Sequence, residues 1–318
     1  MAVNAGIKEV YLDAPNADIT DVGAASVIGL GFRQNGQFIG EPFNPITDNR
    51  NREFPNLFNF RAEFNTMQLS LATMSKLVSF AKAGGASCAI LTAGITKAGS
   101  PPNETISPGT GNIFIFDTTG SRSMGIDWEL RLTPTERMIN VTLERAFSPT
   151  DAVQILNDST TNTLKFASNK VPMLSPNQVS SGFIIPTFVD PDNPNNVVAI
   201  PPIQLGDFSI VLSTESTKNA FNVSLPRGVK MEFTATMSQA DNTVFSNWLS
   251  LATFPTADVR VTLDGSNYIE IKSLSYSKST NFEVGDENRN AVIKLVGMLD
   301  LDFVTTTANS IVFNTYLT

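Results

Sequence analysis

The sequence predicts a mainly β protein built from two tandem modules, each a β-sandwich or barrel flanked by one short helix. Three observations lead to this prediction. Apolar and polar residues alternate over residues 58–66, a pattern typical of a half-buried strand. The alternation returns in nearly the same phase over residues 229–237, a shift of 171 residues. A helical pattern follows each strand at the same shift.

The two predicted helices, over residues 70–83 and 241–252, bury equivalent faces. Their apolar residues recur at i, i+3, i+4 and i+7, which is the spacing of one helix face. These residues are Met74, Leu77, Val78 and Ala81 in the first copy and Phe245, Trp248, Leu249 and Ala252 in the second. Ser70 and Asp241 stand in equivalent N-cap positions. The first helix should end at Gly84, a residue typical of helix C-termini.

After the helices the correspondence resumes with a shift of 155 or 154 residues, because the first copy carries an insertion of about 16 residues in a hairpin. Residues 112–116 align with 267–271, 128–130 with 282–284, and 139–141 with 293–295. The second copy turns tightly at Asp264-Gly265, a strong hairpin pattern. The glycines and prolines of residues 95–111 predict that the first copy opens here into a long mobile loop.

The predicted organisation is therefore a chain of four parts. Module 1 covers residues 1–150, an irregular connecting segment 151–200, module 2 residues 201–305, and a C-terminal extension 306–318. Module 1 should open with a strand over residues 7–12. The extension contains Ile311-Val312-Phe313, which is apolar enough to add a strand to its own sheet or to a neighbour's.

The period of two also predicts which residues form the core. Phe60, Phe64, Met231 and Phe233 share one face of their strands, and Arg61, Glu63, Lys230 and Glu232 share the other. The first set should be buried, and the second should meet water.

Composition narrows the function. The 318 residues carry a net charge of −8, which argues against electrostatic capture of nucleic acid. The sequence has no histidine, the commonest general acid/base at neutral pH and a frequent zinc ligand. The single cysteine, Cys88, is predicted to be buried in an apolar strand. No apolar run approaches the about 20 residues that span a bilayer, and the N-terminus lacks a signal-peptide pattern, so we expect a soluble protein made in the cytoplasm.

Short patterns that could carry chemistry fit structural roles better. Residues 190–196 offer oxygen ligands but lack the glycine and glutamate of a calcium loop, which favours a solvated turn. Residues 94–100 have the outer glycines of a phosphate loop without its lysine, which favours a flexible loop. Ser275 and Lys278 match a Ser-x-x-Lys pattern, but in strand sequence they would point to opposite faces.

The two tryptophans and one equivalent pair of glutamates lead to the same conclusion. Trp128 and Trp248 are interpreted as core aromatics. Glu129 and Glu283 are equivalent in the two copies and have no acid/base partner in the pattern. We therefore predict no catalytic, metal-binding or cofactor-binding residue and no enzyme activity.

The order of elements resembles the tail tube proteins of long-tailed bacteriophages. The resemblance rests on the strand at 58–67, the helix at 70–83, the hairpin and paired strands, and their repetition from Val229 onward, about two thirds of the chain. In that family six modules form a ring, and rings stack into a hollow tube that conducts DNA. The resemblance implies that a two-module chain forms trimeric rings, is part of the virion tail, and assembles in the cytoplasm of the bacterial host.

The resemblance also implies partners. These are other copies of the chain, the tail terminator, tape measure and baseplate proteins, and DNA that passes without specific binding. An acidic or neutral lumen would suit that passage, because it repels phosphate.

Three other interpretations remain open. A ring adaptor or baseplate hub of the same fold would account for the long connection and the insertion. A two-domain carbohydrate-binding or adhesin-like protein would need exposed loop aromatics, for which Phe43 and Phe188 are the main candidates. A hydrolase using two carboxylates would need a recognisable pair, which the sequence does not offer.

Overall fold

A computed structural model describes most of the chain. The described residues are 3–17, 19, 21–22, 28–43, 46–54, 57–66, 71–99, 104–116, 123–133, 137–148, 154–156, 164–166, 183–184, 187–190, 193–199, 203–204, 207–238, 257–264, 267–276, 281–284, 289–300 and 311–313. Within them the protein is mainly β, as the sequence predicts, and contains one helix. The chain divides into two compact units, residues 1–128, 139–173 and 216–227 in the first and residues 129–138, 174–215 and 228–318 in the second.

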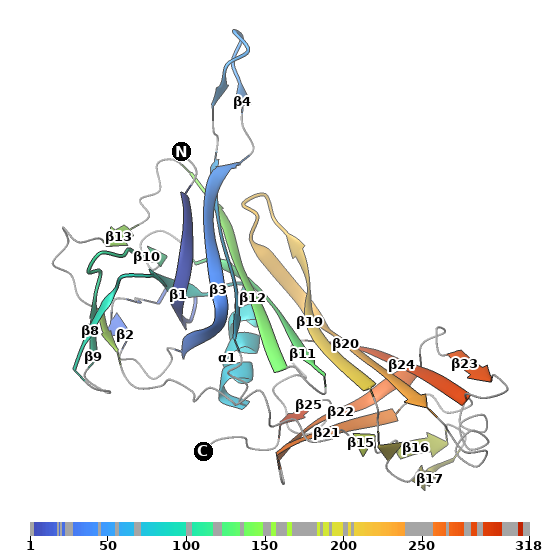
Figure 1. The fold of residues 1–318 in the computed structure, drawn as a ribbon. Helices are drawn as coiled ribbons and strands as arrows, with labels where there is room; N and C mark the ends of the chain where they lie inside the picture. The colour runs from blue at the N-terminus through green and yellow to red at the C-terminus, as the bar shows by residue number, and fades with distance from the viewer. Residues whose placement is uncertain are drawn as a thin grey trace. The chain divides into compact units, whose positions relative to one another are not determined.

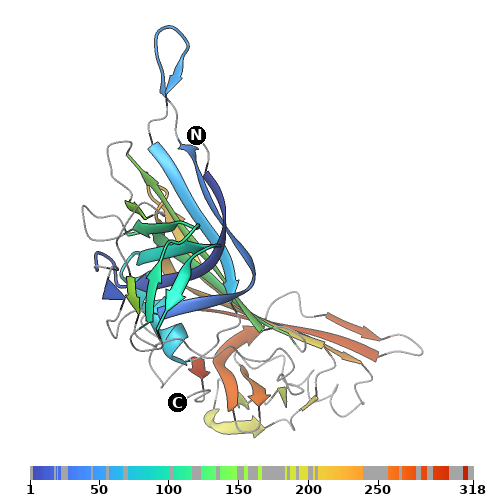
Figure 2. The same cartoon turned by 60° about the vertical axis from the view of Figure 1, so that its left-hand side comes forward.

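One antiparallel sheet organises the first unit. Its strand order is β12 (Arg137–Phe147), β6 (Leu57–Thr66), β3 (Ile28–Phe43), β1 (Val3–Asp13), β7 (Ser87–Thr92), β10 (Ile113–Phe116) and β13 (Gln154–Leu156). Figure 1 and Figure 2 show its long strands, coloured blue to green, running side by side. The expected strand at residues 7–12 is β1.

The core of this unit lies on both faces of β7 and β10. Five phenylalanines form an aromatic cluster with ring centroids 4.5 to 6.0 Å apart: Phe38, Phe60, Phe114, Phe116 and Phe147. A second cluster joins Tyr11, Ile19, Ala89, Leu91, Ile95, Ile106, Ile113 and Ile115. Successive residues of a strand face opposite ways, so β10 supplies alternate side chains to the two clusters. Both strands are therefore buried throughout, and the sequence is apolar along the whole of β10 and from Cys88 to Leu91 in β7.

The insertion in the first copy is not the mobile loop that its glycines and prolines predict. It contains β8 (Thr96–Ala98) and β9 (Glu104–Ser107), which pair in a hairpin. A four-stranded sheet forms in the order β2 (Asp21–Val22), β14 (Leu164–Phe166), β9 and β8. The segment is ordered because it buries two apolar side chains: Ile95 is 8% exposed and Ile106 is 0% exposed.

Helix α1 (Leu71–Lys82) occupies the predicted helical segment. Leu77, Val78 and Ala81 are buried as expected, whereas Ser79 on the intervening position is exposed. The helix ends where predicted, because Gly84 adopts φ +80° and the N–H groups of Gly84 and Gly85 donate to the carbonyls of Ala81 and Phe80. These two bonds make the common glycine C-cap. The predicted cap Ser70 and the second helix, 241–252, lie outside the described residues.

A short hairpin continues the β3–β6 pair. β3 and β6 are paired as far as Phe43 and Leu57, and β4 (Ile46–Thr47) and β5 (Glu53–Phe54) then pair between them in the sequence. Figure 1 labels β4 beyond the ends of the long strands.

The second unit is also antiparallel. The ends of β11 (Gly125–Leu132) and β19 (Asp207–Lys218) pair over Glu129–Leu132, and β20 (Ser224–Ser238) pairs with β24 (Arg289–Asp300). β24 also pairs with β23 (Asn281–Val284) and with the end of β22 (Asn267–Tyr276). A further run has the order β25 (Ile311–Phe313), β22, β21 (Ala257–Asp264), β15 (Phe183–Ile184) and β18 (Ile203–Gln204).

The connecting segment and the C-terminal segment both contain short strands. The connecting segment 151–200 holds short strands, including β16 (Thr187–Asp190) and β17 (Asn193–Ala199), which form a hairpin. In the oxygen-rich run at 190–196, Asp190 of β16 therefore lies opposite Asn193 of β17. The apolar C-terminal segment adds a strand to its own chain, because Ile311 pairs with Ile271 of β22.

The hairpins that follow the two predicted helical segments share one register over four residue pairs. In the first unit Leu91, Ile90, Ala89 and Cys88 pair with Ile113, Phe114, Ile115 and Phe116. Adding 171 to the residue numbers of the first strand and 155 to those of the second gives four expected pairs in the second copy. All four occur between β21 and β22: Thr262 with Tyr268, Val261 with Ile269, Arg260 with Glu270, and Val259 with Ile271. The strand pairs β6–β12 and β20–β24 also correspond, with a difference of two residues. Ile139 lies opposite Thr66, whereas Ile293 lies opposite Ala235 instead of Met237. An even difference keeps every side chain on its original face.

The predicted core face of these strands is largely confirmed. Phe64, Met231 and Phe233 are at most 5% exposed, and Phe60 is half-buried within the aromatic cluster. Arg61 and Lys230 are exposed on the opposite face, while Glu63 and Glu232 are half-buried.

Candidate functional site

A buried carboxylate stands at the centre of a polar cluster in the first unit. Glu144 lies in β12, and the register with β6 places Arg61 directly opposite it and Asn59 opposite Ala146. Residues that are opposite in an antiparallel pair, or two apart along a strand, share one face. Asn59 and Arg61 therefore lie on the same side of the sheet as Glu144.

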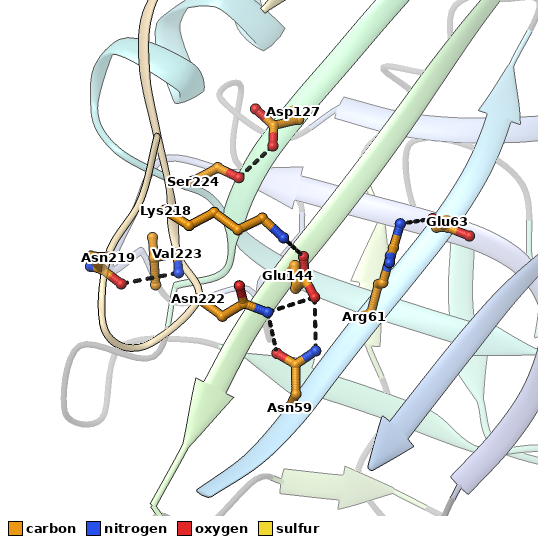
Figure 3. Close-up of polar contacts among 10 residues, drawn as sticks. All are labelled: Asn59, Arg61, Glu63, Asp127, Glu144, Lys218, Asn219, Asn222, Val223 and Ser224. Atoms are coloured by element: carbon orange, nitrogen blue, oxygen red, sulfur yellow. Dashed lines mark hydrogen bonds and ion pairs between the residues drawn. The ribbon is translucent and has the colours of Figure 1, made fainter. Parts of the chain in front are cut away.

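Two more side chains come from the last residue of β19 and from the turn that follows it. We call the four residues the Glu144 cluster: Asn59, Glu144, Lys218 and Asn222. Lys218 Nζ forms an ion pair with Glu144 Oε2. Glu144 Oε1 accepts hydrogen bonds from Nδ2 of Asn59 at 2.8 Å and from Nδ2 of Asn222 at 2.7 Å. Asn222 Nδ2 also donates to Asn59 Oδ1 at 3.2 Å. Figure 3 shows the four side chains pointing toward one another.

The turn that carries Lys218 and Asn222 is held in place by its own hydrogen bonds. Asn219 Oδ1 accepts the N–H groups of Phe221 at 2.9 Å and Val223 at 3.1 Å. Asn222 adopts φ +56°, a conformation that asparagine tolerates better than most residues. The N–H of Ala146 donates to the Phe221 carbonyl at 2.7 Å, which ties the turn to β12. Sequence-distant segments are thus fixed around one carboxylate.

The electrostatics of Glu144 favour its charged form. Its burial would raise the pKa of the carboxyl, but hydrogen bonds from Lys218 and Asn59, together with the charges of Lys218 and Arg61, outweigh that effect and lower the pKa. The side chain of Glu144 is 6% exposed and that of Lys218 is 45% exposed. The lysine therefore brings its charged end to a carboxylate that is shielded from water.

A second ordered turn lies between β4 and β5. Asp48 Oδ1 accepts the N–H groups of Arg50 at 2.8 Å and Arg52 at 2.9 Å, and Asp48 Oδ2 is paired with the Arg52 guanidinium at 2.8 Å. The backbone hydrogen bond from Arg52 is the main cause that lowers the pKa of Asp48. Asn51 closes the turn at φ +57°. This turn displays Arg50 to solvent.

Exposed apolar side chains gather on the β19–β20 hairpin. Among the described residues the large exposed apolar side chains are Phe221, Leu225 and Met298. Phe221 and Leu225 are four residues apart, at and just after the ordered turn. Phe43, an aromatic proposed from the sequence as a ligand platform, is half-buried, and the side chain of Phe188 lies outside the described residues.

The residues singled out in the sequence fall partly within the described part of the chain. Cys88 is buried, as predicted, with its Sγ 3.5 Å from Met124 Sδ. Trp128 is 2% exposed, which agrees with a core role, and Glu129 lies 3.5 Å from Arg131. Ser275 is in strand β22, as expected. Lys278 and Trp248 lie outside the described residues, as does the side chain of Glu283.

Sequence patterns gave no indication of the Glu144 cluster. Asn59 belongs to the face of β6 that alternation marks as polar and solvent-facing, yet it is 3% exposed. The one available pattern was the asparagine pair Asn219 and Asn222, which is typical of a turn. This pair does not indicate which strand the turn packs against.

Comparisons add no relative. No protein-family model and no curated protein matches this sequence. The part of the chain that the structure describes contains no group of three or more Cys, Asp or Glu residues arranged to hold a metal ion. The same part has no helix of the length and apolarity needed to cross a bilayer.

Proposed function

We propose that this chain is a structural subunit that assembles into stacked rings, three chains to a ring, and forms the tube of a long bacteriophage tail. Each chain would contribute two modules, so that three chains supply the six modules of a ring. Other copies of the chain would be the main partners. Tail terminator, tape measure and baseplate proteins would contact the tube, and DNA would pass through it.

The observation that carries the proposal is the shared hairpin register. Four residue pairs of the first hairpin, carried through the sequence shifts of 171 and 155 residues, give four pairs that all occur between β21 and β22. A chance likeness between two amphipathic strands would fix face but not register, because any even offset keeps the faces. This agreement supports two copies of one module in the chain.

The charge of the chain suits a conduit. A net charge of −8 disfavours binding to phosphate, so a passing genome would not be held electrostatically. Pairing between modules of neighbouring chains would also cover sheet edges, which otherwise invite aggregation.

Electron microscopy of the purified full-length protein tests the proposal. We expect rings with a central hole, showing three-fold symmetry that approximates six-fold, and stacks of such rings at higher protein concentration. Light scattering measures the mass of the assembly in parallel. A chain that stays monomeric across the concentration range would refute the proposal, and rings that never stack would favour an adaptor or hub instead of a tube.

A further inference from the structure

We propose that the Glu144 cluster forms a covalent amide bond between the side chains of Lys218 and Asn59, with Glu144 as the acid/base and Asn222 as the group that stabilises the oxygen. This inference does not depend on the proposed tube. It rests on the four hydrogen-bonded side chains, which provide a nucleophile, an acceptor carbonyl, a proton carrier and an oxyanion donor in one place.

Glu144 contacts both of the nitrogens that must exchange protons. Its Oε2 is paired with Lys218 Nζ, and its Oε1 accepts from Asn59 Nδ2 at 2.8 Å. A carboxylate in this position can take a proton from the lysine amine and deliver one to the amide nitrogen that leaves. Its lowered pKa keeps it in the base form that begins the reaction.

Asn59 is the acceptor because its carbonyl is already polarised. Asn222 Nδ2 donates to Asn59 Oδ1 at 3.2 Å, and the same bond would stabilise the negative charge that develops on that oxygen. Asn59 is 3% exposed and Glu144 is 4% exposed, so water competes poorly with the amine. The ordered turn holds Lys218 and Asn222 in place before reaction, which lowers the entropic part of the barrier.

The reaction balances without any co-reactant. Glu144 first accepts a proton from the Lys218 ammonium group, and the resulting neutral amine attacks Cγ of Asn59, so that the new Nζ–Cγ bond forms. Glu144 then gives its proton to Nδ2 and takes the second proton from Nζ, and that proton ends on the departing ammonia as ammonium. The Cγ–Nδ2 bond then breaks and ammonia leaves. Overall, a protonated lysine and an asparagine amide give a secondary amide and an ammonium ion, and nothing is oxidised or reduced. The bond would join β6 to the end of β19.

Mass spectrometry of the full chain tests the proposal. The intact, denatured protein should be lighter than its sequence mass by one ammonia. Because trypsin does not cleave after an acylated lysine, residues 53–61 should appear joined to residues 171–227, with fragmentation placing the bond at Asn59 and Lys218. Ammonia is also lost when an asparagine cyclises beside a glycine, as could occur at Asn35-Gly36. The joined peptides therefore distinguish the proposed cross-link from this side reaction, because cyclisation joins no peptides.

Two matched variants complete the test. Lys218→Arg keeps a cation beside Glu144 but removes the nucleophile, and Glu144→Gln keeps the side-chain size but removes the base. Both should have the full sequence mass and give separate peptides, with circular dichroism spectra like that of the parent. A parent chain whose peptide 53–61 is always free overturns the proposal. Ammonia loss confined to residues 171–227 would overturn Asn59 as the acceptor, since Asn222 lies in that peptide.

Discussion

Replacing Phe38 by alanine should lower the free energy of unfolding of the first unit by about 3–5 kcal/mol. Phe38 is fully buried, and its ring centroid lies 4.5 Å from that of Phe114, 5.6 Å from Phe60 and 6.0 Å from Phe116. Truncation removes the ring from the apolar core and leaves a cavity between three aromatic side chains. Each lost aromatic pair accounts for about 0.5–1.5 kcal/mol of that figure. Since whole domains are stable by about 5–15 kcal/mol, the loss is large.

The matched control is Phe221→Ala, which makes the same chemical change at a side chain that is 50% exposed. It should alter stability by no more than about 0.5 kcal/mol. Urea denaturation followed by circular dichroism gives both values from the shift in midpoint at constant slope. Equal shifts for the two variants would refute the assignment of the aromatic cluster as the core of this unit.

Three further predictions concern other parts of the molecule. While Lys218 is unreacted, the stabilisation due to Glu144 should be fully present above the ordinary pKa of a glutamate and lost as the pH falls through the lowered folded-state pKa. Glu144→Gln should flatten this part of a curve of stability against pH, and an unchanged curve would contradict the assignment. Ile106→Ala should destabilise the first unit by about 2–4 kcal/mol, measured by urea denaturation, because this side chain is fully buried; a change within experimental error would mean that the β8–β9 hairpin is surface decoration. Phe64→Asp should bury an unpaired charge and cost several kcal/mol, whereas Glu63→Gln should change the thermal midpoint little, and normal folding of Phe64→Asp would refute the burial of this face.

The sequence alone determined the parts of the fold that depend on local pattern. Period-two alternation predicted β6 and the buried face that contains Phe64, because a strand sends successive side chains to opposite sides. Helical spacing and Gly84 predicted where α1 lies and where it ends, because these preferences act within one turn of the chain. The alignment of residues 112–116 with 267–271 matched two strands that take the same register against their hairpin partners, but the register of the first hairpin itself comes from the structure.

Only the tertiary structure decided which polar residues are buried. Alternation places Asn59 on the water-facing side of β6, but the β19–β20 turn covers it, and Glu144 thereby gains Lys218 and Asn222 as partners. The β8–β9 segment likewise forms a sheet because Ile106 finds an apolar cluster supplied by β1, β7 and β10. In both cases the stabilising partner is distant in the sequence. Local periodicity fixes the face of a residue but carries no information about what covers that face, since the covering contact depends on how distant segments pack.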